Sequence, residues 1–242
     1  MLRWSVTSRT TLRDGLYQYD ALGRLHDRHD RPRAKVTAKV TGKAAGEAEA
    51  EDIGRYVELG PLGSALYPTR WPRALLIDEI DKSDLDLPND LLNVFEEGEV
   101  HIPELARARA NTIEVRLWRS QARVPITAGK FLCEQFPFVV LTSNGERTFP
   151  APFLRRCIQF TIPEPTSEQL AEIVTGRLGP VTAAADTLIA EFEELRKKGD
   201  LATDQLLNAI FLTLDSARHL PDETRTRLHA MLLKELGQIE AP

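Results

Sequence analysis

A short apolar run that ends in two acids constrains the fold of this chain more than any other feature. Residues Ala74 to Ile77 are continuously apolar, and Asp78 and Glu79 follow directly. A run of this length without polar alternation predicts a strand buried within a parallel sheet. The two carboxylates would then lie at the carboxyl edge of that sheet, where open α/β folds bind their ligands.

The flanking segments alternate between helical and strand patterns. Leucines at helical spacing, with Pro88 in the first turn and Gly98 as a stop, predict a helix over residues 83–98. Apolar runs and alternation predict further strands over residues 112–118, 136–143 and 157–162. This order of strands and helices predicts an α/β fold, a parallel sheet flanked by helices.

The pattern becomes entirely helical after Pro165. Thr166 and Gln169 form a capping-box pair that predicts a helix over residues 167–178. Further helices are expected over residues 182–198, 203–218 and 221–237. We therefore expect two domains, an α/β core over residues 1–165 and a helical domain over residues 166–242.

The N-terminal part is less regular. Leucines and a tyrosine at spacings of three and four predict an amphipathic helix over residues 10–25, interrupted near Gly15 and Gly23. Residues 27–52 are dominated by small and charged side chains, which favours a flexible insertion.

Charge and composition exclude several functional classes. Residues 1–50 hold 10 Lys/Arg and 6 Asp/Glu, a balance of +4, and the remainder of the chain sums to −9. The basic segment has no interleaved aromatic residues between Arg24 and Lys43, so a nucleic-acid partner is not favoured.

Apolar runs of four residues are too short to cross a membrane, and residues 1–20 lack a secretory pattern. The two cysteines cannot form a disulfide framework or a four-ligand zinc site. The default expectation is a cytoplasmic protein without a membrane partner.

Three groups of residues could carry chemistry. At a strand end, Asp78 could help to hold Mg²⁺ beside a nucleoside triphosphate, and Glu79 could polarise the attacking water. Asn144, after the strand predicted over residues 136–143, could hydrogen-bond the γ-phosphate and that water. Arg155 and Arg156 could stabilise transition-state charge on a neighbouring subunit's phosphate. The simpler alternatives are a charged turn, an ordinary turn-forming Asn and a surface arginine pair.

Taken together, these residues resemble the AAA+ ATPases, and most closely the MoxR-like and dynein-related branch. The matching stretches are GPLGSALYP (60–68), PRALLIDEIDKSDLDLPNDLLNVFEEGEV (72–100) and FPFVVLTSNGERTFPAPFLRRCIQFTIPEP (136–165), with a helical lid after them. In that family LIDEID corresponds to Walker B, Asn144 to sensor 1 and FLRR to the arginine-finger position. A β-hairpin insertion follows the helix that ends in FEEGEV.

The resemblance implies an incomplete P-loop NTPase core and an all-α lid. It also implies binding and hydrolysis of ATP with Mg²⁺, coupled to remodelling of an unidentified protein partner. The expected assembly is a ring of like subunits, a hexamer in the commonest case. Asp78 would bind Mg²⁺, Glu79 would activate water, Asn144 would contact the γ-phosphate, and Arg155 or Arg156 would act in trans.

Two departures from the family pattern stand out. A phosphate loop needs Gly-x-x-x-x-Gly-Lys followed by Ser or Thr, and neither Gly42-Lys43 nor Gly129-Lys130 fits it. Residues 1–6 resemble the family's second strand, so we expect the triphosphate-binding loop to be missing from this sequence. In the lid, Asp204 stands where an arginine, sensor 2, is expected, and Arg218 is too far along the helix.

Two other classes of function stay open. A non-hydrolysing adaptor or assembly subunit would keep the AAA+ interface without a nucleotide pocket. A nucleic-acid-binding module would depend only on the basic N-terminal segment.

Overall fold

The computed structural model describes residues 1–30, 53–163, 165–178, 189–190, 192–194, 207 and 210–211. It divides into two compact units, Met1–Gln159 and Phe160–Pro242. Among the described residues, no helix is both long and apolar enough to cross a membrane.

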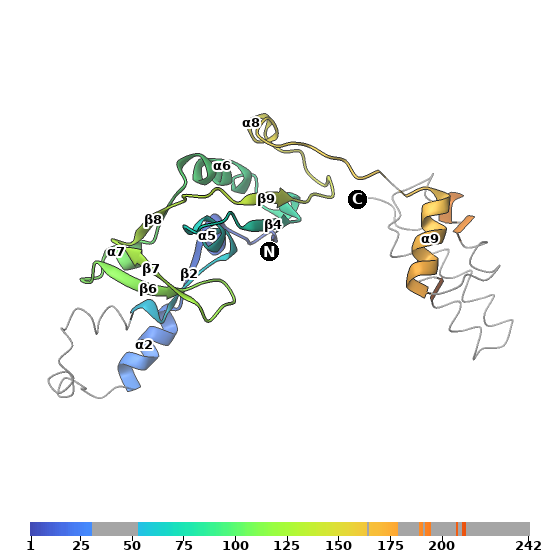
Figure 1. Cartoon of the computed structure of the whole chain (residues 1–242). Coiled ribbons are helices and arrows are strands. Elements are labelled where there is room, and N and C mark those ends of the chain that lie inside the picture. The colour runs from blue at the N-terminus through green and yellow to red at the C-terminus, as the bar shows by residue number, and fades with distance from the viewer. Residues whose placement is uncertain are drawn as a thin grey trace. The chain divides into compact units, whose positions relative to one another are not determined.

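A three-stranded parallel sheet carries the acid pair in the first unit. Its strands are β1 (Leu2–Ser5), β4 (Ala74–Asp78) and β9 (Phe138–Leu141), with β4 in the centre (Figure 1). Both predicted strands, at 74–77 and 136–143, are confirmed, and the first unit is a mixed α/β structure with a parallel sheet flanked by helices.

The two faces of this sheet differ in burial. Leu75 and Ile77 of β4 are fully buried, and they lie beside Trp4 of β1, which is 6% exposed. On the opposite face Phe138 and Val140 of β9 are 70% and 42% exposed. The burial expected for β4 is therefore found on one face, because the face bearing Phe138 and Val140 is open to solvent in the described part of the chain.

A second sheet of six strands is mostly antiparallel, in the order β2-β3-β6-β7-β8-β5. Its strands are β2 (Tyr17–Tyr19), β3 (Val57–Leu59), β5 (Glu99–His101), β6 (Thr112–Arg116), β7 (Arg123–Thr127) and β8 (Lys130–Leu132). Only β3 and β6 pair in parallel. The strand predicted over 112–118 is confirmed as β6. The expected parallel sheet is the one built around β4, whereas short connections join β6, β7 and β8 as antiparallel hairpins.

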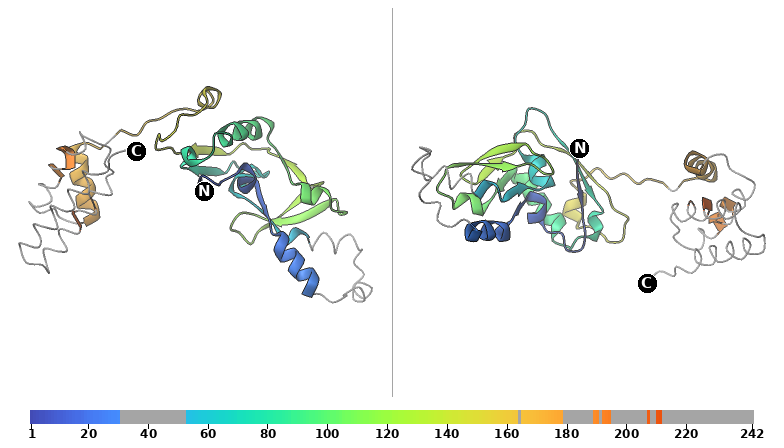
Figure 2. Two further views of the ribbon diagram at one scale, coloured as in Figure 1. Left: turned by 180° about the vertical axis from the view of Figure 1, so that it is seen from behind. Right: turned by 90° about the horizontal axis from the view of Figure 1, so that it is seen from below.

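Several short helices complete the first unit. They are α1 (Leu12–Leu16), α2 (Ala21–Asp30), α5 (Pro61–Leu66), the 3₁₀ helix η1 (Ile80–Lys82), α6 (Leu87–Glu97), α7 (Pro103–Ala106) and α8 (Ala151–Leu154). All six residues of α5 are buried. Figure 1 and the left view of Figure 2 show α2 projecting from the end of the unit where β6 and β7 lie.

The predicted helix over 83–98 is confirmed in its C-terminal part. It begins only at Leu87, because η1 takes up the first turn after the acid pair. The Asp84 Oδ1 accepts the Leu87 N–H over 3.0 Å, which marks the helix start. Gly98 ends the helix with a φ of 65°, in the left-handed region that favours glycine.

The helix expected over residues 10–25, interrupted near Gly15 and Gly23, is confirmed in part: α1 ends at Leu16, just after Gly15, but α2 runs through Gly23 without a break. Strand β2 separates α1 from α2 and pairs antiparallel with β3. Gly15 lies inside α1 and is needed for packing, because a Cβ there would lie 2.4 Å from the Trp4 ring. In the insertion expected over residues 27–52, the first four residues belong to α2, and the others lie outside the described residues.

The strand predicted over residues 157–162 is also wrong. This segment forms neither helix nor strand. Its apolar side chains Ile158, Phe160 and Ile162 are 102%, 84% and 82% exposed. Alternation alone does not make a strand, because a strand needs a neighbour to receive its main-chain hydrogen bonds, and no described strand pairs with this segment.

The second unit begins with the predicted helix. Helix α9 (Ser167–Leu178) is preceded by the capping box, in which the Thr166 N–H donates to Gln169 Oε1 over 3.0 Å. The Gln169 N–H donates to Thr166 Oγ1 over 3.4 Å in return. The remaining expected helices lie mostly or wholly outside the described residues, as do Asp204 and Arg218.

Candidate active site

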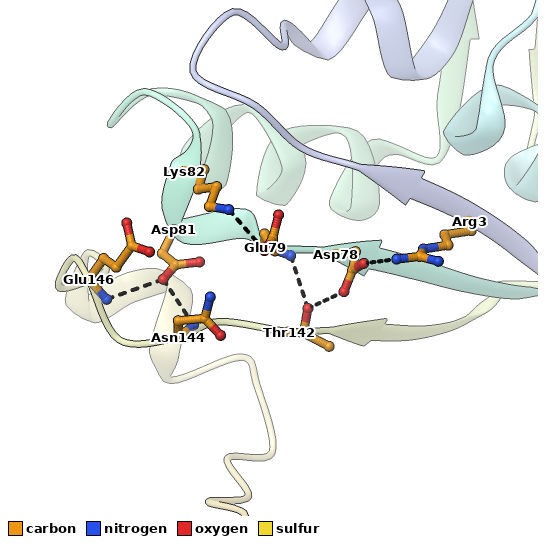
Figure 3. A network of polar contacts seen from close by, with 8 residues as sticks. All are labelled: Arg3, Asp78, Glu79, Asp81, Lys82, Thr142, Asn144 and Glu146. Atoms are coloured by element: carbon orange, nitrogen blue, oxygen red, sulfur yellow. Dashed lines mark hydrogen bonds and ion pairs between the residues drawn. The ribbon is translucent and has the colours of Figure 1, made fainter. Parts of the chain in front are cut away.

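Asp78, Glu79 and Asn144 lie together at the carboxyl edge of the parallel sheet, as Figure 3 shows. Asp78 is the last residue of β4, and Asn144 follows the end of β9 by three residues. Because β4 and β9 are parallel neighbours, their carboxyl ends meet at one edge.

Thr142 bonds to both members of the acid pair. Its hydroxyl donates to Asp78 Oδ1 over 2.7 Å and accepts the Glu79 N–H over 2.9 Å. The Thr142 carbonyl accepts the Ile80 N–H over 3.0 Å. The sequence analysis missed this residue. The available signal was the adjacency of two parallel strands, which places the residue after Leu141 level with the residue after Ile77.

Asp81 is a second residue that the sequence analysis missed. It is 2% exposed, and its Oδ2 accepts the N–H of Asn144 over 2.9 Å and that of Glu146 over 3.2 Å. Its other oxygen, Oδ1, is buried without a hydrogen-bond partner among the described residues. The turn after β9 is therefore bonded to the segment that follows the acid pair.

Glu79 occupies a strained backbone position. Its φ of 58° and ψ of 48° lie in the left-handed region, which a residue with a Cβ adopts at a cost of about 1–3 kcal/mol. The Thr142 hydroxyl fixes its N–H, and its carbonyl accepts the Lys82 N–H over 3.0 Å. Glu79 is thus kept at a sharp turn directly beyond the strand end.

Both acids are paired with cations of the same chain. Arg3 Nη2 lies 2.5 Å from Asp78 Oδ2, and Lys82 Nζ lies 2.9 Å from Glu79 Oε1. The Thr142 hydroxyl, and secondly Arg3, lower the pKa of Asp78, because both stabilise its ionised form. The Glu79 carboxylate raises the pKa of Lys82. Each acid of the Asp78–Glu79 pair therefore has its own cationic partner.

The donor set does not form a site for a metal ion alone. The described residues contain no group of three or more His, Cys, Asp or Glu side chains arranged to hold one. One carboxylate at a strand end does suit a Mg²⁺ ion that keeps several waters and is held mainly by phosphate oxygens. Asp78 fits that role only if Arg3 releases its Oδ2.

No phosphate-binding loop is found among the described residues. Gly129 stands in the turn between β7 and β8 with a φ of 69°, and Lys130 is the first residue of β8. Lys130 Nζ lies 3.3 Å from Glu99 Oε2. Gly129-Lys130 therefore belongs to a hairpin and not to a phosphate-binding loop, in agreement with its mismatch to the loop motif. Gly42-Lys43 lies outside the described residues.

The structure distinguishes the two predicted arginines, which follow α8. Arg156 forms an ion pair with Glu96 of α6 and donates to the Pro152 carbonyl over 3.3 Å. The Arg155 side chain is exposed and forms no hydrogen bond or ion pair with the described residues. Within the described part of the chain, neither arginine makes a polar contact with the acid pair.

Comparison with known proteins leaves the family open: no family model, no curated protein and no solved structure matches this chain. What the site does must therefore be inferred from its own residues.

Proposed function

We propose that this chain carries the water-activating edge of an ATP-hydrolysing site of the AAA+ kind, in the MoxR-like and dynein-related branch. The observation that carries the proposal is the juxtaposition of Asp78, Glu79 and Asn144 at the carboxyl edge of two adjacent parallel strands. Hydrolysis would be coupled to remodelling of a protein partner within a ring of like subunits, with the helical second unit as a lid.

Each residue has a role that its environment supports. Asp78 is held ionised by the Thr142 hydroxyl, as a carboxylate facing a cation must be. Glu79 is held directly beyond the strand end by its left-handed backbone, and its carboxylate would accept a proton from the attacking water. Asn144 would donate its side-chain amide to the γ-phosphate, while its own N–H bonds to Asp81. Mg²⁺, bound with the nucleotide, would neutralise phosphate charge.

Arg155 is the stronger candidate for action on a neighbouring subunit. An arginine that acts in trans must extend from the surface without a competing partner, and the described contacts engage Arg156 rather than Arg155. This assigns the family's arginine-finger position to Arg155.

ATP hydrolysis of this kind requires a phosphate-binding loop, and the 242 residues contain no sequence that matches its motif. The test therefore uses two proteins, the chain itself and a longer chain in which a strand and a phosphate loop precede Met1. Calorimetry with MgATP is expected to detect weak binding at most to the first protein and binding with turnover for the second. Micromolar affinity of the 242-residue chain would show that another part of it cradles the nucleotide.

Two substitutions in the longer chain separate the roles of the acids. Glu79→Gln keeps shape but loses the base, so hydrolysis should fall by about 10²-fold or more while ATP still binds. Asp78→Asn should weaken both binding and turnover, because it weakens the Mg²⁺ contact. If Glu79→Gln hydrolyses ATP at the parent rate, the proposed role of this edge is wrong.

A non-hydrolysing adaptor or assembly subunit is the second candidate. The ion pairs Arg3–Asp78 and Lys82–Glu79 favour it, because they balance both acids without any ligand. An adaptor would show no nucleotide binding even in the longer chain, and Arg3→Gln would not create any.

A further inference from the structure

We propose that Asp81 is a positioning residue, which fixes where Asn144 lies relative to the acid pair Asp78–Glu79. This inference rests on the proposed function in one respect, that Asn144 contacts the nucleotide. The contacts that carry it are drawn in Figure 3, where the Asp81 carboxylate lies between η1 and the turn that bears Asn144.

The turn after β9 has little packing of its own. Residues 143–146 are all exposed. Gly145 has a φ of 79°, and a Cβ added there would meet nothing within 4 Å. The position of Asn144 therefore depends on the few hydrogen bonds that reach the turn, rather than on side chains packed around it.

Asp81 supplies two of those hydrogen bonds from a fixed point. It is 2% exposed, so water cannot readily replace its partners, and a single oxygen receives both N–H groups. The Asp81 backbone is itself placed by the neighbouring Ile80 N–H, which donates to the Thr142 carbonyl over 3.0 Å.

A second contact joins the same two segments. Arg147 Nη1 donates to the Ser83 carbonyl over 2.8 Å, one residue beyond η1. The Asn144 turn is thus bonded on both sides to the segment that follows Glu79. When that segment moves, Asn144 should move with it, which keeps the distance between the amide and the acid pair constant.

The unpartnered oxygen of Asp81 makes a sharp test possible. Because Oδ1 receives no hydrogen bond among the described residues, an Asn at this position can place its NH₂ there and keep its carbonyl oxygen as the acceptor. Asp81→Asn therefore removes the charge and keeps both contacts. Asp81→Leu keeps the branched shape and the number of side-chain heavy atoms, and it removes both contacts.

The experiment measures amide hydrogen exchange at Asn144 and Glu146 in the full chain by NMR. The Ile102 N–H, which bonds to the Gly129 carbonyl in another part of the unit, serves as the reference for global stability. Relative to Ile102, protection in Asp81→Asn should stay within about tenfold of the parent. Protection in Asp81→Leu should fall by more than about tenfold, and the Asn144 side-chain amide signals should shift.

Two results would overturn the proposal. One is unchanged protection at both amides in Asp81→Leu, and the other is a loss of more than about tenfold in Asp81→Asn, which would make charge rather than the acceptor decisive. If Asp81→Leu does not fold, Asp81→Ala, which also removes the acceptor, is measured in its place, and unchanged protection at both amides there would overturn the proposal. Exchange of these amides is measured without nucleotide. Failure of the longer chain to bind MgATP would therefore count against the proposed function but not against the role of Asp81 in placing Asn144.

Discussion

The Thr142 hydroxyl is placed 2.7 Å from Asp78 Oδ1, 64 residues away in the sequence, and accepts the N–H of Glu79 as well. One side chain of β9's C-terminal end thus fixes both acids of β4. This relationship makes the stability of the site edge sensitive to substitution of Thr142.

Thr142→Val keeps the shape of the side chain and removes its hydroxyl. The Asp78 carboxylate would lose a donor and the strained Glu79 turn would lose its acceptor, so the free energy of unfolding should fall by about 1–3 kcal/mol. Thr142→Ser is the matched control and should stay close to the parent. Urea denaturation of the three proteins measures the difference; equal midpoints for Val and Ser would contradict the assigned hydrogen bonds.

Acid sensitivity should depend on Arg3. The Thr142 hydroxyl and Arg3 lower the pKa of Asp78 in the folded state, so this carboxylate stabilises the fold above its unfolded pKa of about 3.9, and that contribution is lost as the pH falls through the folded value. Arg3→Gln should raise the pKa of Asp78 and flatten the fall in stability below about pH 4. Arg9→Gln, at an exposed position in the same segment, is the control. Denaturation midpoints measured across this pH range decide the matter.

Two glycines with similar backbones should respond differently to alanine. Gly129 and Gly145 have φ values of 69° and 79°, so both substitutions introduce strain of about 1–2 kcal/mol. At Gly129 the new Cβ would also lie 2.4 Å from the Ala106 backbone nitrogen, whereas Gly145 is open. Gly129→Ala should therefore be clearly the more destabilising of the two in thermal unfolding. Similar losses would mean that the hairpin adjusts freely.

Substitution of the two adjacent arginines should affect different properties, stability for Arg156 and ATPase rate for Arg155. Arg156→Ala removes an exposed ion pair with Glu96 and should cost at most about 1 kcal/mol of stability. Arg155→Ala should leave stability unchanged and lower the ATPase rate of the assembled longer chain by more than about tenfold. The reverse pattern, with activity lost only in Arg156→Ala, would transfer the role in trans to Arg156.

The open face of β9 predicts poor solution behaviour. Phe138 and Val140 are exposed on one face of a sheet, and such surfaces bind hydrophobic dyes and promote association. The double variant Phe138→Ser/Val140→Thr should lower dye fluorescence and aggregation on heating. Dye binding that is equally low in parent and variant would mean that this face is covered in solution.

The sequence predicted the elements that local patterns define. The apolar run before Asp78, the glycine stop at Gly98 and the capping box at Thr166 each have a local physical cause, and each element is present. The three-residue strand Tyr17–Tyr19 was hidden because its side chains also fit a helical spacing. The strand predicted over residues 157–162 was wrong for the opposite reason. Its alternating pattern is local, but a strand also needs a neighbouring strand to pair with.

The site was predicted only in its outline. Asp78, Glu79 and Asn144 were recognised at their strand ends, but the hydrogen bonds that hold them were not. Thr142 bonds to Asp78 across 64 positions of sequence, and Asp81 bonds to Asn144 across 63. Such contacts depend on strand order and register, which no single segment encodes. The same reason hid the Arg3–Asp78 ion pair, which exists because β1 lies beside β4.

At Glu79 the residue that would best suit the left-handed backbone is not the residue that the proposed reaction requires. Glycine would adopt this conformation without strain, so Glu79→Gly should make the protein more stable by about 1 kcal/mol while removing the carboxylate. A search for stabilising substitutions would select this change early and discard the residue that the proposed reaction needs most. Screening for thermal stability alone would therefore lead engineers of this chain away from its candidate function.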